Sequence, residues 1–410
     1  MKRKKTLIFL FCFLLIGAFG SCSEKDPLLA RYRAIDLSEF QDSFHHARYQ
    51  YENEIPPWQL YESDQILGIA DNILALQNPD GGWPKNLDYQ RIFTQDELEQ
   101  LPLQEFSSST LDNHNGYAQV RYLCRVWEQL KGSDVDTQRY LDAAIRGLKW
   151  ILAAQHTENG GFSGADVDGI TYNDDVMTGT LRLLRDVAAG DNCFSGIPQD
   201  LREMSQVAYS KGITCILRTQ ISITLEDGST ILTAWCQQHS NEEPFAPIWA
   251  RSFEPPSICS RESFDVLKLL MEIPDPDESV RQAIIAGCAF FDRDDVRIHG
   301  KAVRTENTDP FFLKDRTDTT DRFLVEQAGA TDLWARFYAL DGSFDVTGGA
   351  PAPIQGDYPS VLQPIWCDEN CKYVKEYNDL SRERRNGYAY VINGGDQLQA
   401  IFMQWKREHL

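Results

Sequence analysis

Apolar positions recur with helical spacing along most of this chain. They predict helices over residues 63–77, 115–130, 138–155, 174–189, 201–220, 261–272 and 278–291. Strand-like alternation is scarce before about residue 295, where Gly, Pro, Asp and aromatic residues replace the helical period. The sequence therefore predicts an all-α fold with a loop-rich C-terminal segment that wraps one end of it.

Three of the predicted helices end in similar sequence. Ile73-Leu-Ala-Leu-Gln77, Ile151-Leu-Ala-Ala-Gln155 and Ile216-Leu-Arg-Thr-Gln220 are each followed by a turn that contains glycine. Their spacing, roughly 65 to 80 residues, is about that of two helices with their loops. We therefore expect stacked helical hairpins that form a toroid and gather the loops of one end around a single cleft.

The first residues read as an export signal. Lys2-Arg3-Lys4-Lys5 precede the apolar run 7–19, which is shorter than the roughly 20 residues that span a bilayer. Gly20-Ser21-Cys22 resembles the lipobox of bacterial lipoproteins, whose cysteine is lipidated after cleavage. We expect an exported protein, anchored through lipid at the bacterial outer membrane or cell surface. An ordinary signal peptide with an incidental cysteine is the alternative. The predicted organisation is a signal peptide over 1–21, a tether over 22–35 and one domain over 36–410.

Composition restricts the ligands. The chain has 61 acidic and 40 basic residues, and its formal net charge is −21. Four of the basic residues belong to the predicted leader, so this balance argues against a nucleic-acid partner. An acidic polysaccharide would need a local cationic patch or a bridging metal. No cysteine or histidine spacing of a zinc site occurs, whereas Cys367 and Cys371 are close enough in sequence for a disulfide.

Two acidic clusters stand immediately before predicted helices. Thr110-Leu-Asp112-Asn113 precedes helix 115–130, and Asn173-Asp174-Asp175 precedes helix 174–189. Asp and Asn are common helix N-caps, and capping alone explains most such residues. Stacked hairpins, however, bring equivalent helix starts to the same end. Together the clusters offer the hard oxygen ligands that suit Ca²⁺.

Cationic and aromatic residues recur in the predicted loops. They include Trp83-Pro84-Lys85, Trp249-Ala250-Arg251, Trp334-Ala335-Arg336-Phe337-Tyr338 and Arg384-Arg385. Guanidinium groups bind carboxylates at two points, and aromatic rings stack on sugar faces. For any single arginine, a structural ion pair in so acidic a protein is the favoured interpretation. His239 is interpreted as a loop hydrogen-bonding residue, and His114 as a capping or solvent-facing one.

These segments occur in the order seen in family 10 pectate lyases, which the chain resembles over residues 65–390. The matching segments are Gln77-Asn-Pro-Asp-Gly-Gly-Trp-Pro-Lys-Asn86, Thr110-Leu-Asp-Asn113, Ile170-Thr-Tyr-Asn-Asp-Asp175, Thr233-Ala-Trp-Cys-Gln-Gln-His239, Ala250-Arg-Ser-Phe-Glu254, Leu333-Trp-Ala-Arg-Phe-Tyr338 and Glu383-Arg-Arg-Asn-Gly-Tyr388. The chain departs from the family pattern after Asn113, after Gly161, at Ser240 and over 341–363. It therefore resembles a divergent member.

The resemblance implies an incomplete α/α toroid that cleaves polygalacturonate, or a related acidic polysaccharide, by Ca²⁺-dependent β-elimination. Asp112, Asn113 and Asp174 would hold the ion, with Asp175 as a further ligand or orienting group. Arg336 matches the position of the family's base. The implied substrate-binding residues are Lys85, Arg251, Trp334, Tyr338, Arg384 and Arg385.

Two other functions stay open on the sequence. Toroids of this class also host glycoside hydrolases, for which Asp112 with Asp174 or Asp175 would be the acid and base. A non-catalytic uronate-binding lipoprotein is the third hypothesis, because some family segments are replaced. We expect a monomer in each case.

Overall fold

The computed structural model describes residues 30–51, 56–101, 108–190, 192–313 and 316–410. The predicted leader, Cys22 and most of the predicted tether lie outside the described residues, so export and lipidation stay predictions. Within the described part of the chain, no helix has the length and apolar character needed to cross a membrane.

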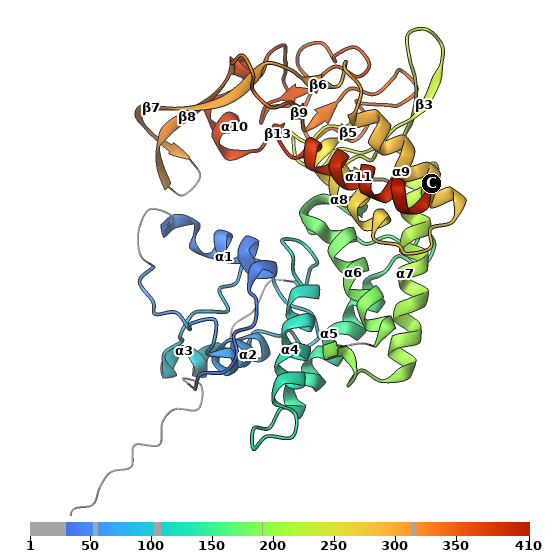
Figure 1. Ribbon diagram of the computed structural model, residues 1–410. Helices are drawn as coiled ribbons and strands as arrows, with labels where there is room; N and C mark the ends of the chain where they lie inside the picture. Colours follow the sequence, from blue (N-terminus) through green and yellow to red (C-terminus); the bar gives the residue numbers. More distant parts are fainter. Residues whose placement is uncertain (1–29, 52–55, 102–107, 191, 314–315) are drawn as a thin grey trace, which may run out of the picture.

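Helices predominate, and all seven predicted helices are confirmed (Figure 1). They are α2 (Ile66–Ala75), α4 (Tyr117–Leu130), α5 (Gln138–Ala154), α6 (Val176–Ala189), α7 (Gln199–Thr219), α8 (Ser260–Met271) and α9 (Glu278–Phe291). Consecutive helices pack as the hairpins α4–α5, α6–α7 and α8–α9. Contacts α4–α6–α8 form one row of helices and contacts α5–α7–α9 a second row. The stacked hairpins agree with the predicted helical architecture, whereas its toroidal form stays a prediction.

The repeated glutamines join successive hairpins. Gln77 Nε2 donates to Ala143 O of α5 (2.9 Å), Gln155 Nε2 to Ala208 O of α7 (2.8 Å), and Gln220 Nε2 to Ala283 O of α9 (3.0 Å). Each of these alanines is followed four residues later by a glycine, at 147, 212 and 287, that lies against a neighbouring side chain. A Cβ on Gly147, for example, would lie 2.5 Å from the Trp83 ring. Small residues at two positions in each of α5, α7 and α9 therefore allow the close stacking.

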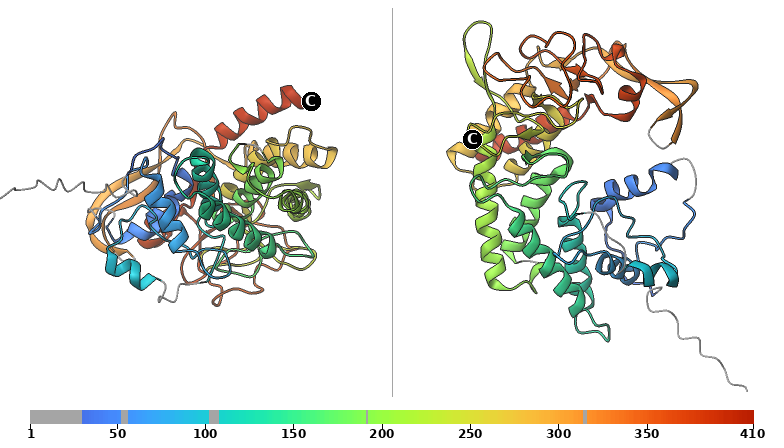
Figure 2. Two further views of the ribbon diagram at one scale, coloured as in Figure 1. Left: turned by 90° about the horizontal axis from the view of Figure 1, so that it is seen from below. Right: turned by 180° about the vertical axis from the view of Figure 1, so that it is seen from behind.

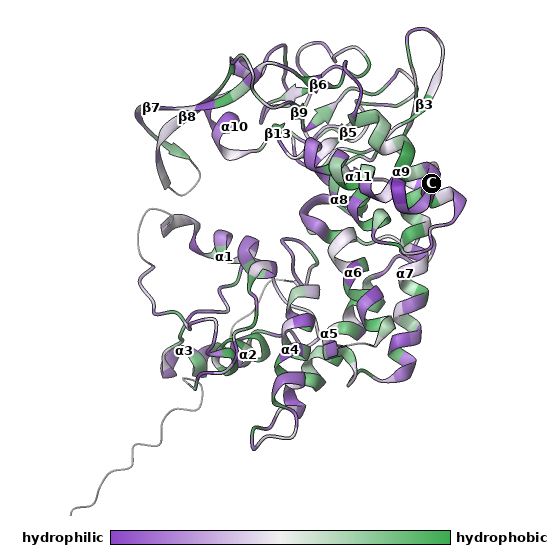
Figure 3. Ribbon diagram, viewed as in Figure 1, coloured by the Kyte–Doolittle hydropathy of each residue, from purple (hydrophilic) through white to green (hydrophobic). Residues whose placement is uncertain are grey.

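Four further α-helices of the described residues were not predicted. They are α1 (Gln41–Arg48), α3 (Gln95–Gln100), α10 (Arg382–Gly387) and α11 (Gly395–His409). The chain also forms short 3₁₀ helices over Ser38–Phe40, Tyr49–Tyr51, Asn173–Asp175, Asn192–Phe194 and Tyr377–Asp379. Helix α11 packs against α8 and α9, so the end of the chain returns to the helical stack. Figure 3 shows α2 mainly hydrophobic, whereas α7 and α11 carry both polar and apolar residues.

The strands are short, with one exception. Strands β7 (Lys301–Leu313) and β8 (Arg316–Glu326) pair into a long antiparallel hairpin. The other pairs are β1 (Ile170–Thr171) with β4 (Gln238–His239), β2 (Ser222–Thr224) with β3 (Thr230–Leu232), β5 (Ile258–Cys259) with β10 (Phe337–Tyr338), and β11 (Trp366–Cys367) with β12 (Tyr373–Val374). β9 (Leu333–Ala335) lies between β6 (Arg297–Ile298) and β13 (Val391–Ile392).

The C-terminal strands and loops lie across one end of the helical stack, and α1 to α3 lie beside it (Figure 2). The predicted loop-rich segment is therefore found at one end of the helices, although it contains the long β7–β8 hairpin and two helices. Cys367 and Cys371 are both buried and both free thiols, so the predicted disulfide is absent from this structure. Side chains from the C-terminal segment and from the loops before α4 and α6 meet at this end.

Candidate active site

The turns before α4 and α6 have unusual backbone conformations. Asn113 and His114 have φ of 54° and 62°, and Asp174 and Asp175 have φ of 50° and 56°. Such left-handed conformations are uncommon for residues other than glycine and cluster at functional sites. The N-cap of α4 is Gly116, and the Asp175 side chain makes no capping hydrogen bond to α6. The capping interpretation of these residues is therefore wrong.

The two turns place Asp112, Asn113 and Asp174 in one acidic region. Asp112 and Asn113 are buried, and Lys85 Nζ lies 2.5 Å from Asp112 Oδ2. Burial lowers the pKa of Lys85, but the hydrogen bond and charge of Asp112 outweigh it and raise that pKa. Lys85, predicted to bind substrate, thus neutralises one predicted metal ligand in the free protein.

Asp174 carries the most perturbed carboxyl group of this region. Burial, followed by the charges of Asp112 and Asp42, raises its pKa to about 7, although Arg336 and Arg251 oppose the shift. Asn173 Nδ2 donates to Asp174 Oδ2 at 2.8 Å. A carboxylate that resists ionisation in the free protein gains most from a cation bound beside it.

Asp175 does not face the same way. His114 Nε2 lies 3.3 Å from Asp175 Oδ2. Burial and the charge of Asp265 raise the pKa of Asp175, and His114 opposes this shift. His114 is therefore a polar neighbour of Asp175 rather than a cap. The structure brings Asp112, Asn113 and Asp174 together and turns Asp175 toward His114.

The residues present fit a hard cation such as Ca²⁺. Asn113 Nδ2 donates to Asn86 Oδ1 at 2.5 Å, which leaves the other atom of its carboxamide 3.1 Å from Asp174 Oδ2. Oxygens about 3 Å apart match adjacent ligands of Ca²⁺, whose bonds are about 2.3–2.6 Å long. Among the described residues, no three His, Cys, Asp or Glu side chains converge as a metal cluster. Amide and carboxylate oxygens with water would therefore supply the ligands.

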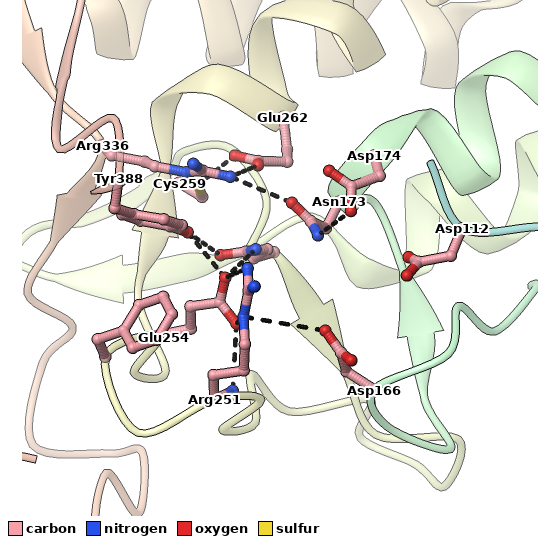
Figure 4. Close-up of polar contacts among 12 residues, drawn as sticks. Asp112, Asp166, Asn173, Asp174, Arg251, Glu254, Cys259, Glu262, Arg336 and Tyr388 are labelled. Carbon is pink, nitrogen blue, oxygen red and sulfur yellow. Dashed lines mark hydrogen bonds and ion pairs between the residues drawn. The ribbon is translucent and has the colours of Figure 1, made fainter. Parts of the chain in front are cut away.

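Arg336 is buried at the opposite side of this region (Figure 4). It forms an ion pair with Glu262, and both side chains are at most 6% exposed. Arg336 Nη2 also donates to Asn173 Oδ1 at 3.1 Å, so a chain of hydrogen bonds joins Arg336 to Asp174. Burial opposes the charge of Arg336, but Glu262 and other neighbours raise its pKa well above the usual value.

Arg251 is more accessible. Its side chain is 42% exposed, and its Nε donates to Glu254 Oε2 at 2.8 Å. Glu254 is almost completely buried and also accepts hydrogen bonds from Gln237 Nε2 and Tyr388 Oη, each at 2.9 Å. Although burial opposes its charge, Arg251 and Arg336 lower the pKa of Glu254 to about 2. Glu254 therefore fixes Arg251 at the surface of the site.

Aromatic rings separate the guanidinium groups. The Phe253 ring lies close to the guanidinium groups of both Arg251 (4.9 Å) and Arg384 (4.1 Å), and the Tyr388 ring lies 4.3 Å from the Arg336 guanidinium. Arg384 is buried, and its Nη1 has no hydrogen-bond partner within the described part of the chain. We call Arg251, Arg336, Arg384, Phe253 and Tyr388 the arginine wall. Such a wall suits anionic sugar rings.

Three residues predicted to bind substrate lie elsewhere. Trp334 is completely buried in the middle strand β9, and its Nε1 donates to Phe291 O at 3.0 Å. Tyr338 is also completely buried, and its hydroxyl donates to Val296 O at 2.7 Å. Arg385 is ion-paired with buried Asp321. In this structure all three are packing residues, which corrects the sequence-based prediction of substrate contact.

The structure also identifies residues that the sequence analysis left without a role. Asn173 and Glu254 belong to the matching segments, but their function as hydrogen-bond partners of Asp174 and Arg251 needs the fold. Glu262 lies on α8, far from Arg336 in sequence. In the sequence, Glu262 could have been noticed only because the helical period places this acidic residue on the buried side of its helix.

One cavity adjoins the site. It has a volume of about 510 Å³, and its lining includes Lys85, Thr110, Trp150 and Ser163. Trp150 packs close to Gly82 and Gly116, which leave room for its ring. A larger cavity of about 680 Å³ lies elsewhere, beside Arg121, Arg125 and Cys193, and includes none of the residues of the candidate site.

His239 lies in β4 and makes hydrogen bonds on both sides of its ring. Its burial makes the stability of the protein depend on pH. Its Nε2 accepts from Cys236 N (3.0 Å) and its Nδ1 lies 2.8 Å from Phe245 O, so the predicted hydrogen-bonding role is confirmed, although His239 lies in a strand and not in a loop. Burial lowers its pKa to about 4, although the bond to Phe245 opposes this shift. The unfolded chain, with a histidine pKa near 6.5, thus takes up this proton first as pH falls.

We expect His239 to cost the native state about 2 to 3 kcal/mol between pH 7 and pH 4.5. Urea unfolding of the natural protein and of His239→Gln at both pH values measures this cost as the difference between their pH slopes. Equal slopes for the two proteins would contradict it.

The comparisons with known proteins agree with this arrangement. A family model described as pectic acid lyase matches residues 77–399. A family 10 polysaccharide lyase from Cellvibrio cellulosa has a similar fold, with a TM-score of 0.64, and a mutant of a family 10 polysaccharide lyase from the same organism, in complex with trigalacturonic acid, has a TM-score of 0.63. Both are 23% identical to this chain, and each alignment covers 91% of this chain and 99% of the other. No curated protein sequence matches the chain.

The family match, together with a helical scaffold that carries acidic turns and an arginine wall, defines a polysaccharide lyase. The chain belongs to the pectic acid lyase family, as a divergent family 10 pectate lyase.

Proposed function

We propose that this protein is an exported, lipid-anchored pectate lyase on an incomplete α/α toroid. It cleaves polygalacturonate by Ca²⁺-dependent β-elimination. The observation that carries this proposal is the hydrogen-bonded path Arg336–Asn173–Asp174, which holds the acidic turns and the arginine wall in one site. An acidic sugar placed between them meets hard oxygen ligands on one flank and guanidinium groups on the other.

The reaction removes the C5 proton of a galacturonate residue. The base takes the C5 proton, the electron pair of the C5–H bond forms the C4–C5 double bond, and the C4–O4 bond of the same residue breaks. That oxygen leaves and takes a proton from water. Ca²⁺ held by Asn113 and Asp174, with Asp112 beside them, would neutralise charge that develops on the C5 carboxylate. Within the arginine wall, Arg384, whose Nη1 has no hydrogen-bond partner among the described residues, would orient a neighbouring carboxylate.

The base is an arginine, and the geometry favours Arg251 over the predicted Arg336. Arg336 is buried against Glu262 and Asn173, so it acts on Asp174 rather than on substrate. Arg251 has the accessible guanidinium. Although burial opposes its charge, Glu254 raises the pKa of Arg251 in the free protein, so proton loss must be helped by neighbouring positive charge.

A direct assay tests the reaction class. With Ca²⁺ and polygalacturonate, we expect ultraviolet absorbance to rise as unsaturated products form, and a chelator to stop the rise until excess Ca²⁺ is added. Highly methylated pectin serves as the comparison substrate. A protein that binds pectate on affinity electrophoresis but forms no product would instead be the non-catalytic uronate-binding lipoprotein.

One observation favours a second candidate. Asp174, with a pKa raised to about 7, has the property expected of the general acid of a glycoside hydrolase. Hydrolysis adds water across the linkage and leaves no double bond. Reducing ends released without ultraviolet absorbance would therefore support the hydrolase.

A further inference from the structure

The acidic region contains one carboxylate from outside the family match. Asp42 lies on α1, whereas the family model begins at residue 77. The carboxamide atom of Asn113 that faces Asp174 is also 3.1 Å from Asp42 Oδ2. Asn113 is only 6% exposed, and its carboxamide has two possible orientations. In the orientation in which its Nδ2 donates to Asn86, its buried oxygen faces the two carboxylate oxygens.

This spacing fits a cation. Two oxygens about 3.1 Å apart subtend an angle of about 80° at an ion with bonds of about 2.4 Å, close to the angles between neighbouring ligands of pentagonal-bipyramidal Ca²⁺. Without an ion, the amide would need the opposite orientation, in which its nitrogen donates to both Asp42 and Asp174. In the first orientation the charge of Asp42 contributes to binding of the cation. In the second, Asp42 accepts a hydrogen bond from Asn113 and needs no cation.

Helix α1 is held firmly enough to present Asp42 to this position. Phe40 and Phe44 are buried, and the Phe40 ring packs against Tyr89 and Tyr122. Leu87 N donates to Ser43 Oγ at 3.0 Å, beside the segment that carries Lys85 and Asn86. Arg48 forms two hydrogen bonds with Asp88, at 2.8 and 2.7 Å. The helix therefore docks on the same loop that lines the cation site.

We propose that Asp42 is a carboxylate ligand of this cation site, supplied by the N-terminal helix α1. The inference rests on the proposed function, because it concerns the Ca²⁺ of that mechanism. Ligand charge is a main determinant of Ca²⁺ affinity. Removal of this charge therefore weakens the site without removing Asn113 or Asp174.

The test is Ca²⁺ titration by calorimetry, without substrate, on the natural protein, Asp42→Asn and Asp134→Asn. Asparagine keeps the size of the side chain and one oxygen at this position but loses the charge. We expect the Kd of Asp42→Asn to rise at least about tenfold. Asp134, exposed in the turn after α4 and without a hydrogen bond or ion pair in the described part of the chain, is the matched control for loss of one acid, and we expect its variant to bind as the natural protein does.

Hydrogen exchange gives a second readout. Ca²⁺ should slow exchange of the α1 amides in the natural protein and in Asp134→Asn, but not in Asp42→Asn. Equal Ca²⁺ affinity and equal protection in Asp42→Asn and the natural protein would overturn the assignment of Asp42 and leave the proposed function intact. A natural protein that binds no Ca²⁺ would overturn both.

Discussion

Replacing Asp174 by asparagine will lower kcat on polygalacturonate by about 10²- to 10³-fold and weaken Ca²⁺ binding. The magnitude is that found when one electrostatic contact to a developing negative charge is lost. Asparagine preserves the size of the side chain and its bond from Asn173 Nδ2, so the left-handed turn should persist. Ultraviolet product assays and Ca²⁺ calorimetry measure the two effects separately.

The same substitution should stabilise the metal-free protein. Burial and neighbouring acids raise the folded pKa of Asp174 to about 7, so its ionisation destabilises the native state progressively as pH rises from about 4 to above 7. At pH 8 without Ca²⁺, Asp174→Asn should therefore have the higher Tm. Added Ca²⁺ should raise the Tm of the natural protein much more than that of the variant.

Asp175→Asn is the matched control in the same turn. Its carboxylate faces His114, so we expect a much smaller loss of Ca²⁺ affinity than for Asp174→Asn. Equal losses in both variants would restore Asp175 to the ligand set predicted from sequence. A fully active Asp174→Asn variant would contradict the proposed role of Asp174.

The helical part of the fold was predictable because each hairpin buries one apolar face. The period of apolar residues located α2 and α4 to α9 to within a few residues. The repeated glutamines were visible, but their partners were not, because an Ala-x-x-x-Gly pattern in the middle of a helix has no local consequence. It matters only when the preceding hairpin supplies a glutamine to Ala143, Ala208 or Ala283.

The C-terminal part was harder to predict for a physical reason. Its helix α11 begins at Gly394-Gly395 without a side-chain capping hydrogen bond and packs on α8 and α9. Trp334 and Tyr338 lie in short strands whose side chains are covered on both sides by elements distant in the chain. Aromatic residues next to an arginine look alike in sequence whether they face solvent or the core.

The candidate site was predictable in its residue types and only partly in its geometry. Two acidic turns at equivalent places in successive hairpins identified Asp112, Asn113 and Asp174. The sequence could not show which arginine is accessible to substrate. In the fold, Glu254 holds Arg251 and Glu262 holds the buried Arg336, and the two glutamates lie on different elements. Asp42 had no sequence signal, because it is one acidic residue among 61 and precedes every repeated motif.

Removal of the Arg251 side chain will cause a large loss of kcat, about 10²- to 10⁴-fold, which is the range for loss of a general base. Arg251→Ala alone would leave Glu254 buried and unpaired, at a cost of several kcal/mol of stability. The variant should therefore combine Arg251→Ala with Glu254→Gln, which removes the stranded charge and keeps hydrogen-bonding groups beside Gln237 and Tyr388. Thermal unfolding checks that the double variant is folded, and calorimetry checks that it still binds Ca²⁺.

Added guanidinium then distinguishes Arg251 from the base predicted by sequence. Because the Arg251 side chain is 42% exposed, its removal opens a space to solvent that a free guanidinium ion can enter, and activity should partly return. The corresponding double variant of the other pair, Arg336→Ala with Glu262→Gln, removes a side chain that is only 6% exposed and should not respond. Its loss should also weaken Ca²⁺ binding, since Arg336 positions Asp174 through Asn173. Rescue of the Arg336 variant together with failure to rescue the Arg251 variant would assign proton abstraction to Arg336 instead.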